Sequence, residues 1–277
     1  MSVTPFVKMH GLGNDFVVID ARRDAFPLDR TRAHAIADRK TGIGCDQLIV
    51  IEKPQRAGAD VFMRIHNADG GEVEACGNAT RCIATLIMAE TGGDRVVVET
   101  NAGLLEARPE SGGRVSVDMG PARIEWREIP LAGAQDTLHV DLAVGNLADP
   151  VCTNMGNPHA TFFVADATSI DLASLGPLLE HHKIFPERAN IGVAQVLSPE
   201  RLRLRVWERG VGITRACGTG ACAALVAASR RGLVGRRAEI VLDGGALTIE
   251  WRGDGHVIMT GPVATSFNGS FDLANLG

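Results

Sequence analysis

The chain has 277 residues, a length that suits two lobes of roughly 130 to 140 residues, each large enough to bury its own core. Its 28 basic and 33 acidic residues give a net charge of −5 with no Lys/Arg run, so we expect neither a nucleic-acid nor a membrane partner. The first residues lack a basic segment followed by an apolar one, and no apolar run reaches about 18 residues. We therefore expect a cytoplasmic protein.

The cysteines and histidines show no spacing typical of a metal site or a disulfide framework. The six cysteines include no CxxC pair, and the eight histidines are scattered without an HExxH motif. Cys45, Cys82, Cys152 and Cys222 are most simply core residues. We expect no metal ion.

The first lobe alternates strand patterns with two helix patterns. A tight loop presents Asn14 before a strand at 16–20, a helix is expected at 30–40, and strands at 47–51 and 62–66 follow. The last of these leads into a turn at 67–70, after which a helix begins at Cys76 and ends before Gly92. Two strand patterns, VVVETNAGLLEA and GRVSVDMGPA, close the lobe.

The second lobe repeats this order. Gly156-Asn157 before TFFVAD matches Gly13-Asn14 before FVVID, and ACGTG at 216–220 matches ACGNA at 75–79. The segment 191–195, IGVAQ, is aligned with 43–47, IGCDQ, which makes Gln195 the counterpart of Gln47. From Asn67 to Pro121 the offset is a constant 141 residues, which makes Glu208 the counterpart of Asn67 in the second lobe. The pattern indicates an internal duplication.

We therefore predict an α+β fold of two pseudo-symmetric lobes, each with a β-sheet wrapped around a central helix. The expected boundaries are 1–122 for the N-terminal lobe and 123–264 for the C-terminal lobe. Two similar lobes bring equivalent loops toward a shared cleft, a common place for a ligand.

Each lobe places a cysteine, Cys76 or Cys217, at the N-terminus of its central helix. The unsatisfied N–H groups and the dipole there favour negative charge, so they lower a thiol pKa and can also bind a carboxylate. A pair of acid-base groups related by pseudo-symmetry suits racemisation or epimerisation, because a proton leaves one face of a carbon and arrives on the other. None of the four lysines lies in a motif typical of pyridoxal phosphate enzymes, so we expect no cofactor.

The sequence resembles the diaminopimelate epimerase family along nearly its whole length. The motifs that carry the resemblance are HGLGNDF, GIGCDQL, NADGGEVEACGNATRC, GNPHA, FPERANIG and WERGVGITRACGTGA. It implies interconversion of LL- and meso-2,6-diaminoheptanedioate, on the route to lysine and peptidoglycan, by a cofactor-independent two-base cysteine mechanism. It also implies a homodimer, and a last strand, 265–277, that packs back on the N-terminal lobe.

The resemblance also implies roles for individual residues. Cys76 and Cys217 correspond to the two acid-base residues, and His159 and Glu208 to residues that assist them. The implied substrate contacts are Asn14, Gln47, Asn67, Gly77, Asn78, Asn157, Asn190, Glu208, Arg209, Gly218 and Thr219. The chain departs from the usual pattern at Ala75, Ala79 and Cys45, none of which removes a functional group.

The residue types in this set agree with a substrate that has two amino-acid ends. Arg209 supplies a bidentate fork for a carboxylate, and Glu208 a counter-charge for an ammonium. Three other readings stay open: a proline racemase-like enzyme, a non-enzymatic amino-acid binding protein, and a thiol-disulfide protein. Proline has no second amino-acid end for Arg209 and Glu208 to hold, and thiol-disulfide proteins normally carry CxxC on one helix.

Overall fold

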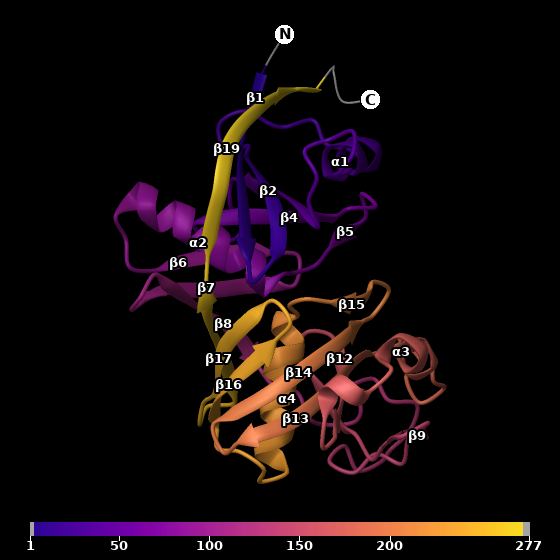
Figure 1. The fold of residues 1–277 in the computed structure, drawn as a ribbon. Coiled ribbons are helices and arrows are strands. Elements are labelled where there is room, and N and C mark those ends of the chain that lie inside the picture. The colour runs from indigo at the N-terminus through magenta and orange to yellow at the C-terminus, as the bar shows by residue number, and fades with distance from the viewer. Residues whose placement is uncertain (1–2, 274–277) are drawn as a thin grey trace. The chain divides into compact units, whose positions relative to one another are not determined.

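The computed structural model describes residues 3–273 and divides the chain into two compact units (Figure 1). Unit 1 comprises Met1–Val117 and Gly261–Gly277, and unit 2 comprises Asp118–Thr260. Of the expected last strand, residues 274–277 lie outside the described residues.

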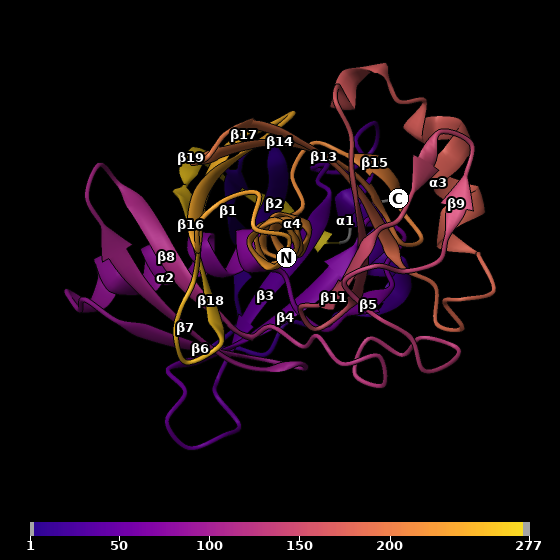
Figure 2. The ribbon, with the colours of Figure 1, turned by 90° about the horizontal axis from the view of Figure 1, so that it is seen from below.

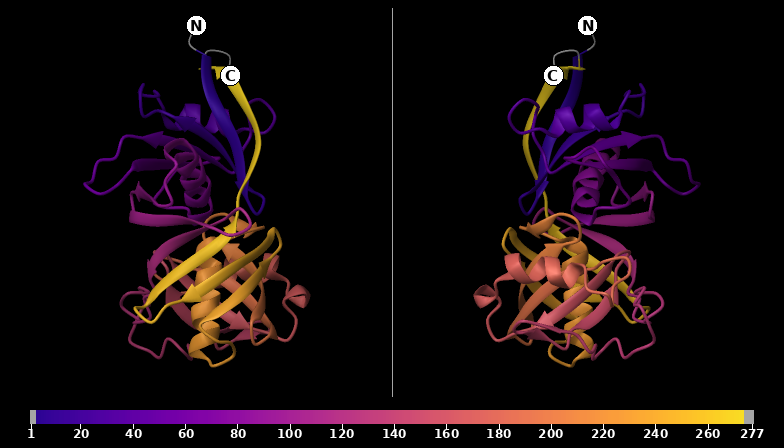
Figure 3. Two further views of the ribbon diagram at one scale, coloured as in Figure 1. Left: turned by 90° about the vertical axis from the view of Figure 1, so that its left-hand side faces the viewer. Right: turned by 90° about the vertical axis from the view of Figure 1, so that its right-hand side faces the viewer.

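Unit 1 consists of a mixed sheet and two helices. Its strands are β1 (Val3–Gly11), β2 (Asn14–Asp20), β3 (Gln47–Glu52), β4 (Val61–Asn67), β5 (Glu72–Val73), β6 (Val96–Thr100), β7 (Gly103–Glu110), β8 (Arg114–Pro121), which runs across the unit boundary, and β19 (Ala264–Asp272); its helices are α1 (Arg30–Ala37) and α2 (Gly77–Thr91). The final strand, β19, pairs antiparallel with the first, β1, and the two run side by side in Figure 3. Residues near the two ends of the chain are thereby joined in one sheet.

Unit 2 repeats this order from its third strand onward, with a short strand pair before it and an added 3-10 helix. Its strands are β9 (Ala143–Val144), β10 (Leu147–Ala148), β11 (Val151–Asn154), β12 (Pro158–Phe163), β13 (Asn190–Ser198), β14 (Arg201–Glu208), β15 (Gly212–Thr214), β16 (Arg237–Leu242), β17 (Gly245–Trp251) and β18 (His256–Pro262), whose last residues lie past the unit boundary; its helices are the 3-10 turn η1 (Ala167–Ser169), α3 (Leu172–Glu180) and α4 (Gly218–Arg230).

The two units share one sequence of strand pairings. In unit 1, β1–β2 is antiparallel, β2–β3 parallel, β3–β4 antiparallel, β4–β6 parallel, and β6–β7 and β7–β8 antiparallel. In unit 2, β11–β12 is antiparallel, β12–β13 parallel, β13–β14 antiparallel, β14–β16 parallel, and β16–β17 and β17–β18 antiparallel. The predicted duplication is therefore present in the topology as well as in the sequence.

The register corrects one detail of the expected alignment. Gln47 lies opposite Asn67 where β3 meets β4, and Ile191 lies opposite Trp207 where β13 meets β14. The residue that corresponds to Gln47 is therefore Asn190, the first residue of β13, and not Gln195. The local similarity was misleading because Ile43 and Gly44 precede their strand, whereas residues 191 and 192 lie inside theirs.

A buried helix forms the centre of each unit. In α4 every side chain from Ala221 to Ala228 is buried, and strands of unit 2 surround the helix in Figure 2. In α2 the buried residues run from Gly77 to Ala84, with Ile87 and Met88. Cys82 and Cys222 are fully buried, as expected for core residues. Small residues dominate both helices, which lets the surrounding strands approach closely.

Two local expectations change, and one helix was not expected. The segment VVVETNAGLLEA forms two strands, β6 and β7, because the chain turns at residues 101–102. Helix α1 ends at Ala37, since the carboxylate of Asp38 accepts the backbone N–H groups of Lys40 and Thr41 at 2.7 Å and folds the chain into a turn. Helix α3, which sequence patterns did not predict, contains a proline. No helix within residues 3–273 is long and apolar enough to cross a membrane.

Candidate functional site

The two cysteines predicted to be acid-base residues are N-caps of equivalent helices. Cys76 precedes α2 and Cys217 precedes α4, with backbone angles φ −147°, ψ 109° and φ −114°, ψ 108°. These extended conformations are typical of N-cap residues. The N–H groups of Gly77 and Asn78 in one unit, and of Gly218 and Thr219 in the other, belong to the first turn, whose N–H groups have no partner within the helix. Each helix start can therefore accept an anion.

In unit 1 the Cys76 thiol lies beside Asn14. Its Sγ atom is 3.8 Å from Oδ1 of Asn14, and the same oxygen accepts a hydrogen bond from Nδ2 of Asn78 at 3.2 Å. Asn14 comes from the start of β2 and Asn78 from the first turn of α2. The structure thus brings together three of the predicted residues of this unit.

Gln47 and Asn67 form a second pair in unit 1. They lie opposite each other at one end of the β3–β4 ladder, and Nε2 of Gln47 donates to Oδ1 of Asn67 at 3.0 Å. The chain then turns, with the backbone N–H of Gly70 donating to the carbonyl of Asn67. Because β4 ends at this turn, the pair lies at the strand end from which the chain continues to α2.

In unit 2 the Cys217 thiol is buried, with 4% of the residue exposed. Its sulfur accepts the backbone N–H of Gly220 at 3.3 Å and lies 3.6 Å from the hydroxyl of Thr219. Burial raises the pKa of Cys217 well above its usual value, and the negative charge of Glu208 raises it further. The hydrogen bonds from Thr219 and from the backbone N–H of Gly220 at the helix N-terminus lower this pKa, as expected, but desolvation and Glu208 outweigh them, so the net shift is upward.

Glu208 and Arg209 lie where β14 ends, as their position in the repeat predicted. The hydroxyl of Thr214 in β15 donates to Oε1 of Glu208. The backbone N–H of Arg209 donates to Oδ1 of Asn190 at 2.9 Å, and its Nη1 donates to the carbonyl of Glu187 at 2.9 Å. Asn190 is held in turn by its Nδ2, which donates to the carbonyl of Pro158 at 2.9 Å.

His159 is buried in β12 and faces Asn157. Its Nε2 atom lies 2.8 Å from Oδ1 of Asn157, and only 2% of the residue is exposed. Burial lowers the pKa of His159 to about 3, with a further contribution from the positive charge of Arg209. The imidazole is therefore neutral at pH 7, and the bond to an amide oxygen requires the tautomer that carries its proton on Nε2.

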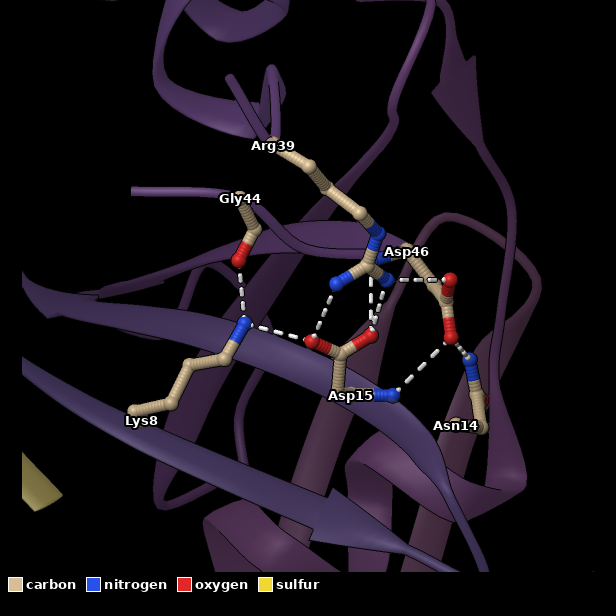
Figure 4. A network of polar contacts seen from close by, with 6 residues as sticks. All are labelled: Lys8, Asn14, Asp15, Arg39, Gly44 and Asp46. Atoms are coloured by element: carbon tan, nitrogen blue, oxygen red, sulfur yellow. Dashed lines mark hydrogen bonds and ion pairs between the residues drawn. The ribbon is translucent and has the colours of Figure 1, made fainter. Parts of the chain in front are cut away.

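Sequence patterns missed several residues that support this set. Lys8, Asp15, Arg39 and Asp46 form a charged network next to Asn14, shown in Figure 4. In unit 2, the buried carboxylate of Glu180 accepts from Nε1 of Trp207 at 2.7 Å and from the backbone N–H of Gly210 at 2.9 Å, on either side of Glu208 and Arg209. Asp15 and Asp46 adjoin predicted residues in the chain, which was the available signal; nothing local marked Glu180.

The diaminopimelate epimerase family model matches residues 6–125 and 151–266. The chain belongs to this family. Membership makes it an isomerase. It is 63% identical over 267 residues to a diaminopimelate epimerase from Rhodospirillum centenum, covering 96% of this chain and 92% of that one. It is 59% identical over 274 residues to one from Acidiphilium cryptum, covering 98% of both chains.

Solved structures with low sequence identity share the fold of this chain. A phenazine biosynthesis protein of the PhzF family from Bacillus anthracis matches with a TM-score of 0.70 at 15% identity, covering 98% of this chain and 100% of that one. A hydroxyproline epimerase from Agrobacterium vitis matches with a TM-score of 0.70 at 16% identity, covering 100% of this chain and 94% of that one. The predicted fold of duplicated α+β lobes is confirmed.

Proposed function

We propose that this isomerase interconverts LL- and meso-2,6-diaminoheptanedioate without a cofactor, with Cys76 and Cys217 as its two acid-base residues. The observation that carries the proposal is that each unit places a cysteine as the N-cap of its central helix. A duplicated acid-base group fits a reaction whose substrate and product differ in the hand of a single carbon.

In the proposed reaction, the thiolate of one cysteine takes the α-proton and becomes a thiol, leaving a carbanion. The thiol of the other cysteine delivers its proton to the opposite face of the carbon and becomes a thiolate. One C–H bond breaks and one forms, and no electrons are gained or lost. In the reverse direction the two residues exchange roles.

The carbanion needs stabilisation because an amino-acid Cα–H is far less acidic than a thiol. We assign this stabilisation to backbone N–H groups at a helix start, where the helix dipole favours the negative charge of the substrate's reacting carboxylate. A high thiol pKa also helps the step, because the thiolate of such a thiol is a stronger base. Burial and Glu208 raise the pKa of Cys217 in this way.

The distal amino-acid end of the substrate is assigned to the polar residues at the end of β14 and their neighbours. A guanidinium has five N–H donors, so the bond from Arg209 to the carbonyl of Glu187 leaves others for a carboxylate. Glu208 supplies a negative charge for the ammonium group. We assign directional hydrogen bonds with the substrate to Asn14, Gln47, Asn67, Asn157 and Asn190.

His159 is assigned a positioning role. Because its imidazole is neutral, it donates a hydrogen bond to Asn157 without adding positive charge to the site. This fixes the amide of Asn157 with its Nδ2 directed away from the ring and available to a substrate oxygen.

The resemblance to the family supports placing the enzyme in the cytoplasm, as a homodimer in the biosynthesis of lysine and peptidoglycan precursors. Light scattering coupled to size-exclusion chromatography tests the dimer: twice the chain mass of 29.3 kDa supports it, and the single mass contradicts it.

The proposed activity is tested by assaying LL-diaminopimelate and L-proline side by side. Epimerisation of LL-diaminopimelate alone supports the proposal, racemisation of L-proline supports a proline racemase-like enzyme, and binding without turnover supports a binding protein. Cys76→Ala and Cys217→Ala should each abolish epimerisation. Cys222→Ala, which changes a core residue of α4, is the matched control and should remain active.

A further inference from the structure

Asp46 connects the charged network of unit 1 to the amide of Asn14 (Figure 4). Its Oδ2 atom accepts from Nδ2 of Asn14 at 3.3 Å and from the backbone N–H of Asp15 at 3.1 Å. Its Oδ1 atom accepts from Nη2 of Arg39 at 2.8 Å. Both oxygens of the carboxylate are therefore engaged, one of them by Asn14.

The rest of the network holds this carboxylate in place. Arg39 also binds both oxygens of Asp15, at 2.5 and 3.1 Å, and the backbone N–H of Asp46 donates to Oδ1 of Asp15 at 3.1 Å. Buried Lys8 donates to Asp15 at 2.5 Å and to the carbonyl of Gly44. Although burial acts in the opposite direction, the bonds from Arg39 and Lys8 hold the pKa of Asp15 well below its usual range. Asp15 therefore stays ionised and joins β1 to the loop before β3 through its bonds to Lys8, Arg39 and Asp46.

The amide of Asn14 is bound at both ends. A carboxylate only accepts hydrogen bonds, so Nδ2 of Asn14 must face Asp46. Oδ1 consequently points the other way, where it accepts from Nδ2 of Asn78 at 3.2 Å and lies 3.8 Å from Sγ of Cys76. With the amide turned over, two oxygens would meet at Asp46 and two N–H groups at Asn78.

We propose that Asp46 is a positioning residue that turns the carbonyl oxygen of Asn14 toward the Cys76 thiol and so favours the protonated form of Cys76. This inference rests on the proposed role of Cys76 as an acid-base residue. A carbonyl oxygen accepts a hydrogen bond from S–H, whereas an amide N–H in its place would stabilise the thiolate. The orientation of one amide thereby prepares Cys76 as the proton donor before substrate binds.

The test is the rate at which iodoacetamide alkylates Cys76 at pH 7, followed by peptide mass mapping. Only the thiolate reacts, so the rate reports the protonation state of this one sulfur. Asp46→Ala removes the acceptor for Nδ2 of Asn14 and should raise the rate about two- to tenfold, the range that corresponds to loss of one ordinary hydrogen bond. An unchanged or slower rate would overturn the proposal.

A double-mutant cycle separates orientation from direct charge, because deleting Asp46 also removes a negative charge near the thiol. In an Asn14→Ala background, Asp46→Ala should have no further effect on the rate, since the amide through which Asp46 acts is gone. An increase of the same size in that background would show that charge alone is responsible and would contradict the positioning role.

Two further variants complete the design. Asp20→Ala is the matched control, because Asp20 lies at the other end of β2 and also pairs with an arginine, Arg22; its Cys76 should react at the wild-type rate. Should Asp46→Ala fail to fold, Asp46→Ser replaces it, since its hydroxyl is too short to reach Asn14. Alkylation is measured without turnover, so a negative result here is distinct from a failure to epimerise diaminopimelate, which would refute the proposed function itself.

Discussion

Nε2 of His159 lies 2.8 Å from Oδ1 of Asn157, and burial holds the imidazole neutral with a pKa of about 3. In the unfolded chain the pKa is about 6.5, so between pH 6.5 and 3 the unfolded state binds a proton that the folded state does not. The free energy of unfolding therefore falls as the pH falls through this window, by about 1.4 kcal/mol per pH unit from this residue alone. Above pH 7 the contribution is constant.

Replacing His159 by Gln should remove that share of the acid sensitivity. Urea unfolding of the wild type and His159→Gln at pH 8, 6, 5 and 4 measures it, with the pH 8 value giving the packing cost of the substitution. The difference between the two proteins should shrink as the pH falls. A constant difference from pH 8 to 4 would mean that His159 titrates normally in the folded protein.

A second prediction concerns the buried thiol of Cys217. Burial and Glu208 raise its pKa, so its thiolate should form at a higher pH than that of an ordinary cysteine. Glu208→Gln removes the negative charge and should shift the pH profile of Cys217 alkylation to lower pH. Glu187→Gln changes a carboxylate in the segment before β13 and serves as the control. A profile that does not move in Glu208→Gln would exclude Glu208 as a cause of the high pKa.

A third prediction concerns selection of the distal end of the substrate. Arg209→Lys keeps the positive charge but loses the planar fork, and should cost about 1.5 to 3 kcal/mol in kcat/KM for diaminopimelate if the guanidinium binds a carboxylate. L-lysine, which lacks the second carboxylate, should be a very poor substrate. Undiminished kcat/KM in Arg209→Lys, or fast epimerisation of L-lysine, would show that another residue selects the substrate.

A fourth prediction concerns Glu180, which is 2% exposed and accepts from Nε1 of Trp207 and the backbone N–H of Gly210. Glu180→Ala leaves both donors unsatisfied, which costs about 1 to 3 kcal/mol for each that stays buried. Urea unfolding should show a free energy of unfolding that is lower by an amount in that range. Because the two donors flank Glu208 and Arg209, the KM for the substrate should also rise. Exposed Glu200, in the turn before β14, provides the control variant Glu200→Ala. Equal stability of the two variants would contradict the role given to Glu180.

The fold was predictable from the sequence because apolar patterns occur twice in the same order. The same repeat placed Asn67 and Glu208 at equivalent strand ends, and both positions are confirmed. Pairing Gln195 with Gln47 failed because similarity over five residues says nothing about register. The ladders assign that place to Asn190.

The supporting contacts were not predictable, because they join residues far apart in the chain. Lys8, Asp15, Arg39 and Asp46 come from β1, β2 and two positions in the loop before β3, and only folding brings their charges together. The high pKa of Cys217 depends on burial and on Glu208. A helix N-terminus can be predicted from sequence, whereas the desolvation that outweighs it here cannot.

Deuterium incorporation during turnover in D₂O tests the two-thiol mechanism most directly. If one cysteine removes the α-proton and a different one delivers its own, early product carries deuterium at the inverted carbon while recovered substrate carries little. Mass spectrometry of both diastereomers at low conversion measures the two fractions. The two-thiol account predicts strong labelling of product only, and equal early labelling of product and substrate would contradict it by showing that a single base serves both faces.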